Sequence, residues 1–152
     1  MIDEGSPAPD FELTSDAGET VRLSDLRGRP VVLYFYPKDD TPGCTMQACG
    51  LRDVSGELED RGAVVLGVSR DDEASHRRFK EKYGLQFTLL SDPDASVADR
   101  YGVWVERLMY GKKSMGINRS TFVIDADGNV AKVLYGVKPD GHADKVLAAL
   151  PS

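Results

Sequence analysis

The six residues from Val31 to Tyr36, VVLYFY, constrain the fold more than any other segment of this chain. An uninterrupted run of β-branched and aromatic residues predicts a strand that is buried on both faces of a sheet. Ala63 to Val68, AVVLGV, predicts a second strand of the same kind, and a helical pattern follows each run. Buried strands that alternate with helices are typical of an α/β fold whose central sheet is covered on both sides.

The rest of the chain continues this alternation. Further strands are predicted at Phe87 to Leu90, Thr121 to Asp125 and Val130 to Tyr135, the last two forming an antiparallel pair around Asp127-Gly128. Helices are predicted from Pro42 past Leu58, from Glu73 to Tyr83, from Pro93 to Tyr101 and from about Gly141 to Leu150. The first thirty residues are expected to form an extended arm with a hairpin turn around residues 16–18, and Val105 to Asn118 a mobile loop. This order resembles the thioredoxin-like fold with a mixed sheet, and we expect residues 1–152 to form a single domain.

The charge balance argues against several classes of partner. The chain carries 25 acidic and 19 basic residues, a formal net charge of -6, which disfavours broad contact with nucleic acid or anionic lipid. No apolar run approaches the roughly 20 residues that span a bilayer, and Met1-Ile2-Asp3-Glu4 lacks the basic and apolar parts of a signal peptide. We therefore expect a cytoplasmic protein that binds neither nucleic acid nor membrane.

Two cysteines, Cys44 and Cys49, follow the first buried strand. A close pair in a cytosolic chain favours a redox or metal site over a disulfide scaffold. Thr41 as N-cap and Pro42 as first helical residue predict a helix whose first turn carries Cys44. Unpaired backbone N–H groups there favour the thiolate, which is the form that attacks a peroxide oxygen. The Thr41 hydroxyl is placed to cap the helix and to hydrogen-bond the sulfur or a peroxide.

The segment at residues 36–45, YPKDDTPGCT, contains Pro-x-x-x-Thr-x-x-Cys and resembles the active-site loop of peroxiredoxins. The following QACGLRD, residues 47–53, is similar to the segment that bears the second cysteine in the bacterioferritin comigratory protein, or Q-type, branch of that family. PAPDF at 7–11, FTLLSD at 87–92 and RSTFVID at 119–125 extend the resemblance over nearly the whole chain. The resemblance implies a thioredoxin-like fold and a peroxidase.

The resemblance also implies a role for five residues. Cys44 would attack hydrogen peroxide or an organic hydroperoxide and become a sulfenic acid, and Cys49 would resolve it as a disulfide within one chain. Thr41 would orient the peroxide and the sulfur, Pro37 would shield the thiolate from water, and Arg119 would stabilise the thiolate and polarise the peroxide. Thioredoxin or a similar dithiol would then reduce the disulfide, with no metal or organic cofactor. The sequence ends soon after the last predicted helix, without the cysteine-bearing carboxy-terminal extension of peroxiredoxins that resolve across a dimer, so resolution within one chain is expected. We expect a monomer, with a weak dimer left open.

Helix geometry adds a constraint on the two cysteines. Residues five apart in a regular helix have Cα atoms roughly 8–9 Å apart, whereas a disulfide needs about 4.4–6.8 Å. We therefore expect the first turns of the helix to unwind before Cys44 and Cys49 bond. Gly50, which costs about 1 kcal/mol in a helix interior, should make this easier. Slow unwinding would allow a second peroxide to oxidise Cys44 to the sulfinic acid.

Simpler alternatives exist for each of these residues. The cysteines could be structural thiols, Thr41 only an N-cap, Arg119 a surface residue and Pro37 only a strand terminator. His76 and His142 are expected at the surface. Neither lies near the cysteine loop in sequence and the paired spacing is absent, which disfavours a Cys2His2 zinc site and a cysteine–histidine protease. At the level of function, a general disulfide oxidoreductase and a redox-sensing or holdase module are the alternatives, although the Cys-x-x-Cys spacing of the first is absent.

Overall fold

Nine strands and six helical segments make up the computed structural model, which describes residues 2–151 and, at Met109, the backbone alone. The strands are β1 Glu12–Ser15, β2 Thr20–Arg22, β3 Val31–Phe35, β4 Val64–Ser69, β5 Thr88–Ser91, β6 Trp104–Met109, β7 Lys112–Ile117, β8 Ser120–Ile124 and β9 Val130–Leu134. The helices are η1 Leu23–Leu26, a 3-10 turn, and α1 Pro42–Asp53, α2 Ser55–Asp60, α3 Glu73–Tyr83, α4 Ser96–Arg100 and α5 His142–Ala149. Within the described residues, every helix is too short or too polar to cross a bilayer.

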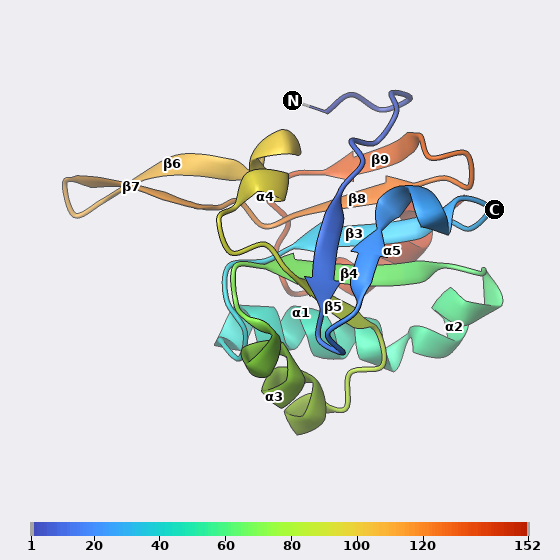
Figure 1. Cartoon of the computed structure of the whole chain (residues 1–152), viewed down its shortest axis with the longest axis horizontal. Helices are drawn as coiled ribbons and strands as arrows, with labels where there is room; N and C mark the ends of the chain where they lie inside the picture. The colour runs from blue at the N-terminus through green and yellow to red at the C-terminus, as the bar shows by residue number, and fades with distance from the viewer. Residues whose placement is uncertain (1, 152) are drawn as a thin grey trace.

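Seven of the strands form one mixed sheet in the order β2-β1-β5-β4-β3-β8-β9 (Figure 1). The three central strands β3, β4 and β5 are parallel, while β8 pairs antiparallel with β3 and β1 antiparallel with β5. Residues 16–18 form the expected turn between β1 and β2, and residues 125–129 the turn between β8 and β9. The predicted α/β, thioredoxin-like architecture with a mixed sheet is confirmed.

The run from Val31 to Tyr36 contributes to the core on both faces of the sheet, as predicted. Because successive side chains of a strand point to opposite faces, Leu33 and Phe35 pack on one side, with η1 and α4, and Tyr34 and Tyr36 on the other. The second face is covered by α1, α2, α3 and α5. The two cysteines therefore belong to the helical layer on that face.

Helix α3 has the predicted bounds, Glu73 to Tyr83, and is capped at both ends. The Asp72 side chain accepts a hydrogen bond from the Ser75 amide at the first turn, and Gly84 ends the helix in the left-handed conformation at φ 63°. The rings of Phe79 and Tyr83 pack edge to face with centroids 5.5 Å apart. The loop that precedes α1 is hydrogen-bonded to this helix.

The single helix predicted from Pro42 past Leu58 is wrong in one respect, because α1 ends at Asp53 and α2 begins at Ser55. Val54 leaves the helical region at φ -107° and ψ 16°, and its amide bonds the Leu51 carbonyl. Asp53, Val54 and Ser55 are all weaker helix formers than Ala, Leu or Arg, which favours a break there.

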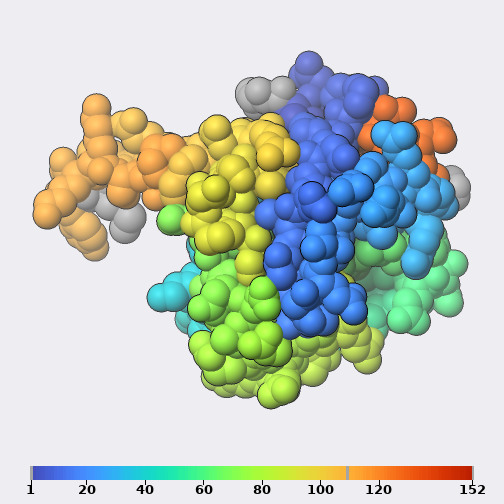
Figure 2. All heavy atoms as spheres, in the orientation of Figure 1, coloured from blue at the N-terminus to red at the C-terminus, as the bar shows by residue number. Residues whose placement is uncertain are grey.

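The expected loop from Val105 to Asn118 is also wrong, because β6 and β7 form an antiparallel hairpin that projects from the body of the molecule (Figures 1 and 2). Its turn residues Tyr110 and Gly111 both have positive φ, 52° and 76°, as a tight two-residue hairpin turn requires. The glycines and lysines in this segment made it look like a loop, since these residues are uncommon in buried sheets.

Candidate active site

The first turn of α1 places Cys44 against the sheet. The chain leaves β3 at Phe35, forms a short loop, and enters the helix at Pro42, where the missing N–H of proline costs nothing. The buried residues of α1 are Cys44, Gln47, Ala48 and Leu51. Spacings of three, four and seven residues put them on one face of the helix, so that Cys44 is only 2% exposed.

Thr41 occupies the N-cap position in an extended conformation, but its side chain does not cap the helix. Its hydroxyl instead donates to the carbonyl of Lys38 at 2.8 Å. The prediction that the Thr41 hydroxyl caps the helix is therefore wrong. The hydroxyl instead joins the two ends of a short turn, residues 38 and 41, in the loop before the helix. Its lone pairs are left to accept a hydrogen bond from another molecule.

The guanidinium of Arg119 lies beside the sulfur of Cys44. In the antiparallel pairing of β3 with β8, Phe35 stands opposite Ser120, so the residue before β8 lies next to the loop that follows β3. Nη2 of Arg119 is 3.4 Å from Cys44 Sγ, and Nη1 donates to Gln47 Oε1 at 2.5 Å. A cation at this distance stabilises a thiolate relative to a thiol.

Gly43 leaves the space that the Arg119 side chain occupies. A Cβ on residue 43 would lie 3.2 Å from Arg119 Nη2 and 3.2 Å from Pro139 Cγ, closer than most side-chain contacts. The loop motif therefore needs a small residue just before Cys44 if the guanidinium is to reach the sulfur.

Cys49 lies on the same helix and is half-buried, and both cysteines are free thiols. Gly50 follows it, with space for a Cβ at an ordinary contact distance, 3.7 Å, from Ala143 of α5. Because α1 is continuous from Pro42 to Asp53, the two sulfurs are held apart in this conformation.

His142, expected at the surface, is buried at the start of α5. Its Nε2 is 2.7 Å from Thr121 Oγ1, and its ring packs near that of Tyr34. Burial, with the positive charges of Arg119 and Lys145, lowers the pKa of His142 to about 4. The neutral imidazole is therefore the dominant form near pH 7.

His76, also expected at the surface, is fully buried on α3. Its Nδ1 is 2.7 Å from Asp39 Oδ2, in the loop before α1. Burial alone would lower the pKa of His76, but the hydrogen bond and charge of Asp39 outweigh it and raise the pKa. Both surface assignments are wrong because the partners that make burial possible come from distant parts of the chain.

Of the five residues implied by the resemblance, three come together. Cys44, Thr41 and Arg119 surround the start of α1, Cys49 lies farther along the helix, and Pro37 is exposed in the loop after β3. Gln47 was missed as a partner of Arg119, although its position one helical turn after Cys44 was a usable signal.

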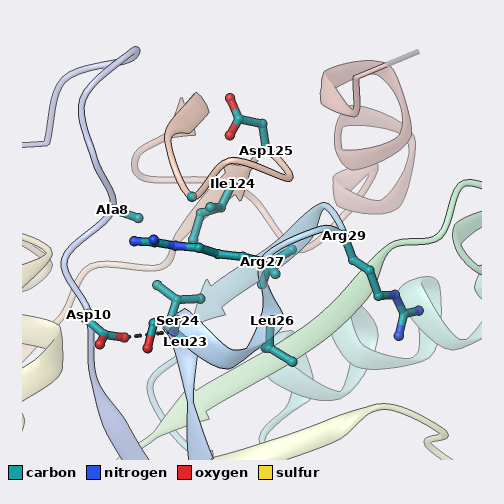
Figure 3. A pocket seen from close by; sticks show the side chains of 11 residues that line it. Ala8, Asp10, Leu23, Ser24, Leu26, Arg27, Arg29, Ile124 and Asp125 are labelled. Carbon is teal, nitrogen blue, oxygen red and sulfur yellow. Dashed lines mark hydrogen bonds between the residues drawn. The ribbon is translucent and has the colours of Figure 1, made fainter.

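The hollow drawn in Figure 3 is separate from this site. A cavity of about 20 Å³, room for a single water, is lined by Leu23, Arg27 and Ile124 among others and shares no residue with the cysteine site (Figure 3). Within residues 2–151, no group of three or more His, Cys, Asp or Glu side chains is arranged to hold a metal ion.

Comparison with known proteins gives consistent matches over nearly the whole chain. The family model AhpC/TSA matches residues 5–133. Peroxiredoxin Bcp of Bacillus subtilis is 47% identical over 149 residues, 98% of this chain and 95% of the relative. Peroxiredoxin Bcp of Escherichia coli K12 is 50% identical over 143 residues, 94% of this chain and 92% of the relative.

Solved structures agree with the sequence matches. The bacterioferritin comigratory protein of Xanthomonas campestris, described for its alkyl peroxide reduction activity, superimposes with a TM-score of 0.91 at 40% identity, covering 97% of this chain and 96% of that one. Similarity of this extent shows that the two proteins share one fold over nearly their whole length.

Proposed function

This chain belongs to the AhpC/TSA family, in its Bcp or Q-type peroxiredoxin branch, and is a thiol-dependent peroxidase; we propose that Cys44 is the thiol that reacts with the hydroperoxide. The observation that carries the proposal is the 3.4 Å approach of Arg119 Nη2 to Cys44 Sγ at the first turn of α1. A buried sulfur beside a guanidinium and unpaired helix amides is an environment suited to a thiolate nucleophile.

The first step oxidises Cys44. The thiolate attacks the terminal oxygen of the hydroperoxide, the O–O bond breaks, and the sulfur keeps that oxygen as a sulfenic acid. The other oxygen leaves as an alkoxide or hydroxide and takes a proton to become an alcohol or water. Arg119 supplies positive charge where negative charge passes from the sulfur to the leaving oxygen.

Thr41 and Pro37 assist this step from the loop before the helix. The Thr41 hydroxyl already donates to Lys38, so it is oriented to accept a hydrogen bond from the O–H of the peroxide. Pro37 lies exposed in the same loop, and the role proposed for it is to limit the access of water to the thiolate.

The second step forms a disulfide between Cys44 and Cys49 and releases water. The Cys49 thiol attacks the sulfenic sulfur, which requires the first turns of α1 to unwind because the intact helix keeps the sulfurs too far apart. Gln47 Nε2, which is buried on this part of α1 without a hydrogen-bond partner in the described residues, favours the opening, because unwinding would expose it to water.

A thiol reductant completes the cycle by exchange with the disulfide. Thioredoxin or a similar dithiol is the proposed reductant, since the half-buried Cys49 becomes the accessible sulfur once the helix opens. A cysteine pair that is reduced after every turnover fits a reducing compartment, and we place the protein in the cytoplasm as a monomer.

The test uses the reduced protein with hydrogen peroxide and a thioredoxin system, with consumption of the reductant as the readout. Cys44→Ser should abolish turnover, and Cys49→Ser should stop it after about one equivalent of peroxide. Sustained turnover by Cys49→Ser would assign resolution to an external thiol, and activity of Cys44→Ser would overturn the proposal. Sedimentation of the reduced and oxidised protein tests the monomer.

A further inference from the structure

A buried network of polar side chains joins the loop before α1 to α3. Asp39 Oδ1 accepts a hydrogen bond from Tyr36 Oη at 2.5 Å, and Oδ2 accepts one from Ser75 Oγ at 2.8 Å. Oδ2 also lies 2.7 Å from His76 Nδ1. The side chains of Asp39 and His76 are 3% and 0% exposed, so water contributes little to holding either group.

The contacts of His76 fix how many protons the pair holds. Its Nε2 is 3.0 Å from the carbonyl of Leu90, which can only accept, so Nε2 carries a proton. A neutral ring of this tautomer would present a lone pair to the carboxylate at 2.7 Å. The contact is attractive only if a second proton lies between Nδ1 and Oδ2, on either atom.

The groups around the pair favour keeping that proton. Asp71, from the loop between β4 and α3, accepts hydrogen bonds from the amide of Asp39 and from Ser69 Oγ, and its negative charge faces the same region. Tyr36, the residue after β3, adds a neutral hydroxyl that also lies 3.5 Å from His76 Nδ1, and β5 adds only the Leu90 carbonyl. No Lys or Arg side chain donates to the pair within the described residues, so nothing there replaces the proton as a source of positive charge.

The loop that this network holds is the loop that carries the peroxide-binding groups. Asp39 precedes Thr41 by two residues and Cys44 by five. The next residue, Asp40, has a positive φ of 56° and binds Lys82 and Tyr83 at the far end of α3. The side chains of Asp39 and Asp40 therefore both anchor the loop to α3, and the buried one is Asp39.

We propose that Asp39 and His76 are positioning residues of the peroxidase, which hold Thr41 and the first turn of α1 in the reactive conformation for as long as the pair shares its proton. The proposal rests on the proposed function of Cys44. When the proton is lost at alkaline pH, the carboxylate and the ring lone pair repel, the loop loosens, and α1 unwinds more readily. Although burial acts against it, the hydrogen bond and charge of Asp39 raise the pKa of His76, which agrees in direction with a pair that holds its second proton more strongly than a free imidazole does.

Two substitutions of Asp39 separate positioning from general stability. Asp39→Ala removes the anchor, and we expect the second-order rate of Cys44 oxidation at pH 7 to fall about tenfold, with faster amide exchange in residues 38–44. Asp39→Asn has the same shape, and its amide can donate to the neutral ring without a shared proton. This variant should stay close to wild type at pH 7.

The decisive measurement is the rate of Cys44 oxidation in Asp39→Asn divided by the rate in the wild type, as a function of pH. Each rate is measured in a single-turnover reaction with hydrogen peroxide, by mass spectrometry of the peptide that contains Cys44. The ratio removes the pH dependence of the peroxide and of Cys44 itself, and we expect it to rise about tenfold from pH 7 to alkaline pH. Asp72→Asn, which caps α3 without touching the loop, is the matched control and should give a flat ratio.

A flat ratio for Asp39→Asn, or an Asp39→Ala protein with wild-type rate and amide exchange, would overturn the proposal. If Asp39→Ala does not fold, the Asp39→Asn profile still decides. Failure of wild-type Cys44 to react with peroxide would instead overturn the proposed function, and amide exchange in residues 38–44 across pH would still test the anchor.

Discussion

The side chain of Gln47 holds Arg119 in place, since its Oε1 accepts a hydrogen bond from Nη1 at 2.5 Å while Nη2 of the same guanidinium points to Cys44 Sγ. One turn of α1 thus carries both the proposed nucleophile and the group that orients its cation. The other half of the amide, Nε2, is buried without a hydrogen-bond partner in the described residues. Gln47 is therefore suited to its interaction with Arg119 and poorly suited to simple packing.

Replacement of Gln47 by methionine should slow the oxidation of Cys44 by about tenfold, because the lost hydrogen bond to a charged group lets the guanidinium move from the sulfur. The free energy of unfolding should change little, since the substitution also removes an unsatisfied buried donor. Stopped-flow oxidation with hydrogen peroxide measures the first quantity and urea denaturation the second. Gln86→Met, at an exposed glutamine, is the control. An unchanged rate for Gln47→Met would contradict the orienting role.

Replacement of Gly50 by alanine should slow disulfide formation about fivefold, because alanine stabilises the helix interior by about 1 kcal/mol. The new Cβ would lie 3.7 Å from that of Ala143, an ordinary contact, so strain does not oppose this gain. More Cys44 should then be found as sulfinic acid at high peroxide, by mass spectrometry. Gly56→Ala in α2 is the matched control, since a Cβ there meets nothing within 4 Å. Equal closure rates for the two variants would argue against helix unwinding as the limiting step.

The sequence was most informative where structure depends on local pattern. The apolar run from Val31 to Tyr36 and the Thr41-Pro42 helix start place Cys44 without any tertiary information. The position of Arg119 beside the Cys44 sulfur could not be predicted from a local pattern. Arg119 follows Cys44 by 75 residues in the chain and reaches it only because β8 pairs with β3. The resemblance to a family supplied that contact, and periodicity could not.

The two histidines show the same limit of prediction from local sequence. His76 lies among Ser75, Arg77 and Arg78, a polar context that favours the surface, and it is buried only because Asp39 meets it from another element. His142 depends in the same way on Thr121. A buried polar residue is defined by a distant partner, which is why a local pattern gives the wrong answer for both.

The hydroxyl of Thr41 should matter for peroxide reduction and little for the helix, since it makes no capping bond. Thr41→Val keeps the shape but loses the donor to Lys38 and the proposed acceptor for the peroxide, and the rate of Cys44 oxidation should fall about 100-fold. Thr41→Ser should retain most of the rate. The check is a single-turnover reaction of both variants together with far-ultraviolet circular dichroism. A slow Thr41→Ser protein with intact helices would show that the methyl group, and not the hydroxyl, is the important part.

The buried neutral His142 should make the protein less stable as the pH falls from about 6.5 to about 4. Its pKa is lowered to about 4 in the folded state by burial and by Arg119 and Lys145, whereas the unfolded chain binds a proton near the ordinary value of 6.5. The unfolded state therefore holds more protons throughout this window, and the loss in the free energy of unfolding is on the order of 3 kcal/mol. His76 does not oppose it there, because its pKa is raised and its contribution is lost only at higher pH.

The comparison that isolates this effect is His142→Gln, whose amide can keep a hydrogen bond to Thr121 but cannot titrate. Urea unfolding at pH 6.5 and at pH 4 should show a loss in wild type that exceeds the loss in the variant by about 3 kcal/mol. Carboxylates with lowered pKa, such as Asp16, affect both proteins alike and act mainly at the acid end of the window. Parallel losses in the two proteins would mean that His142 is protonated, or solvated, in the folded state.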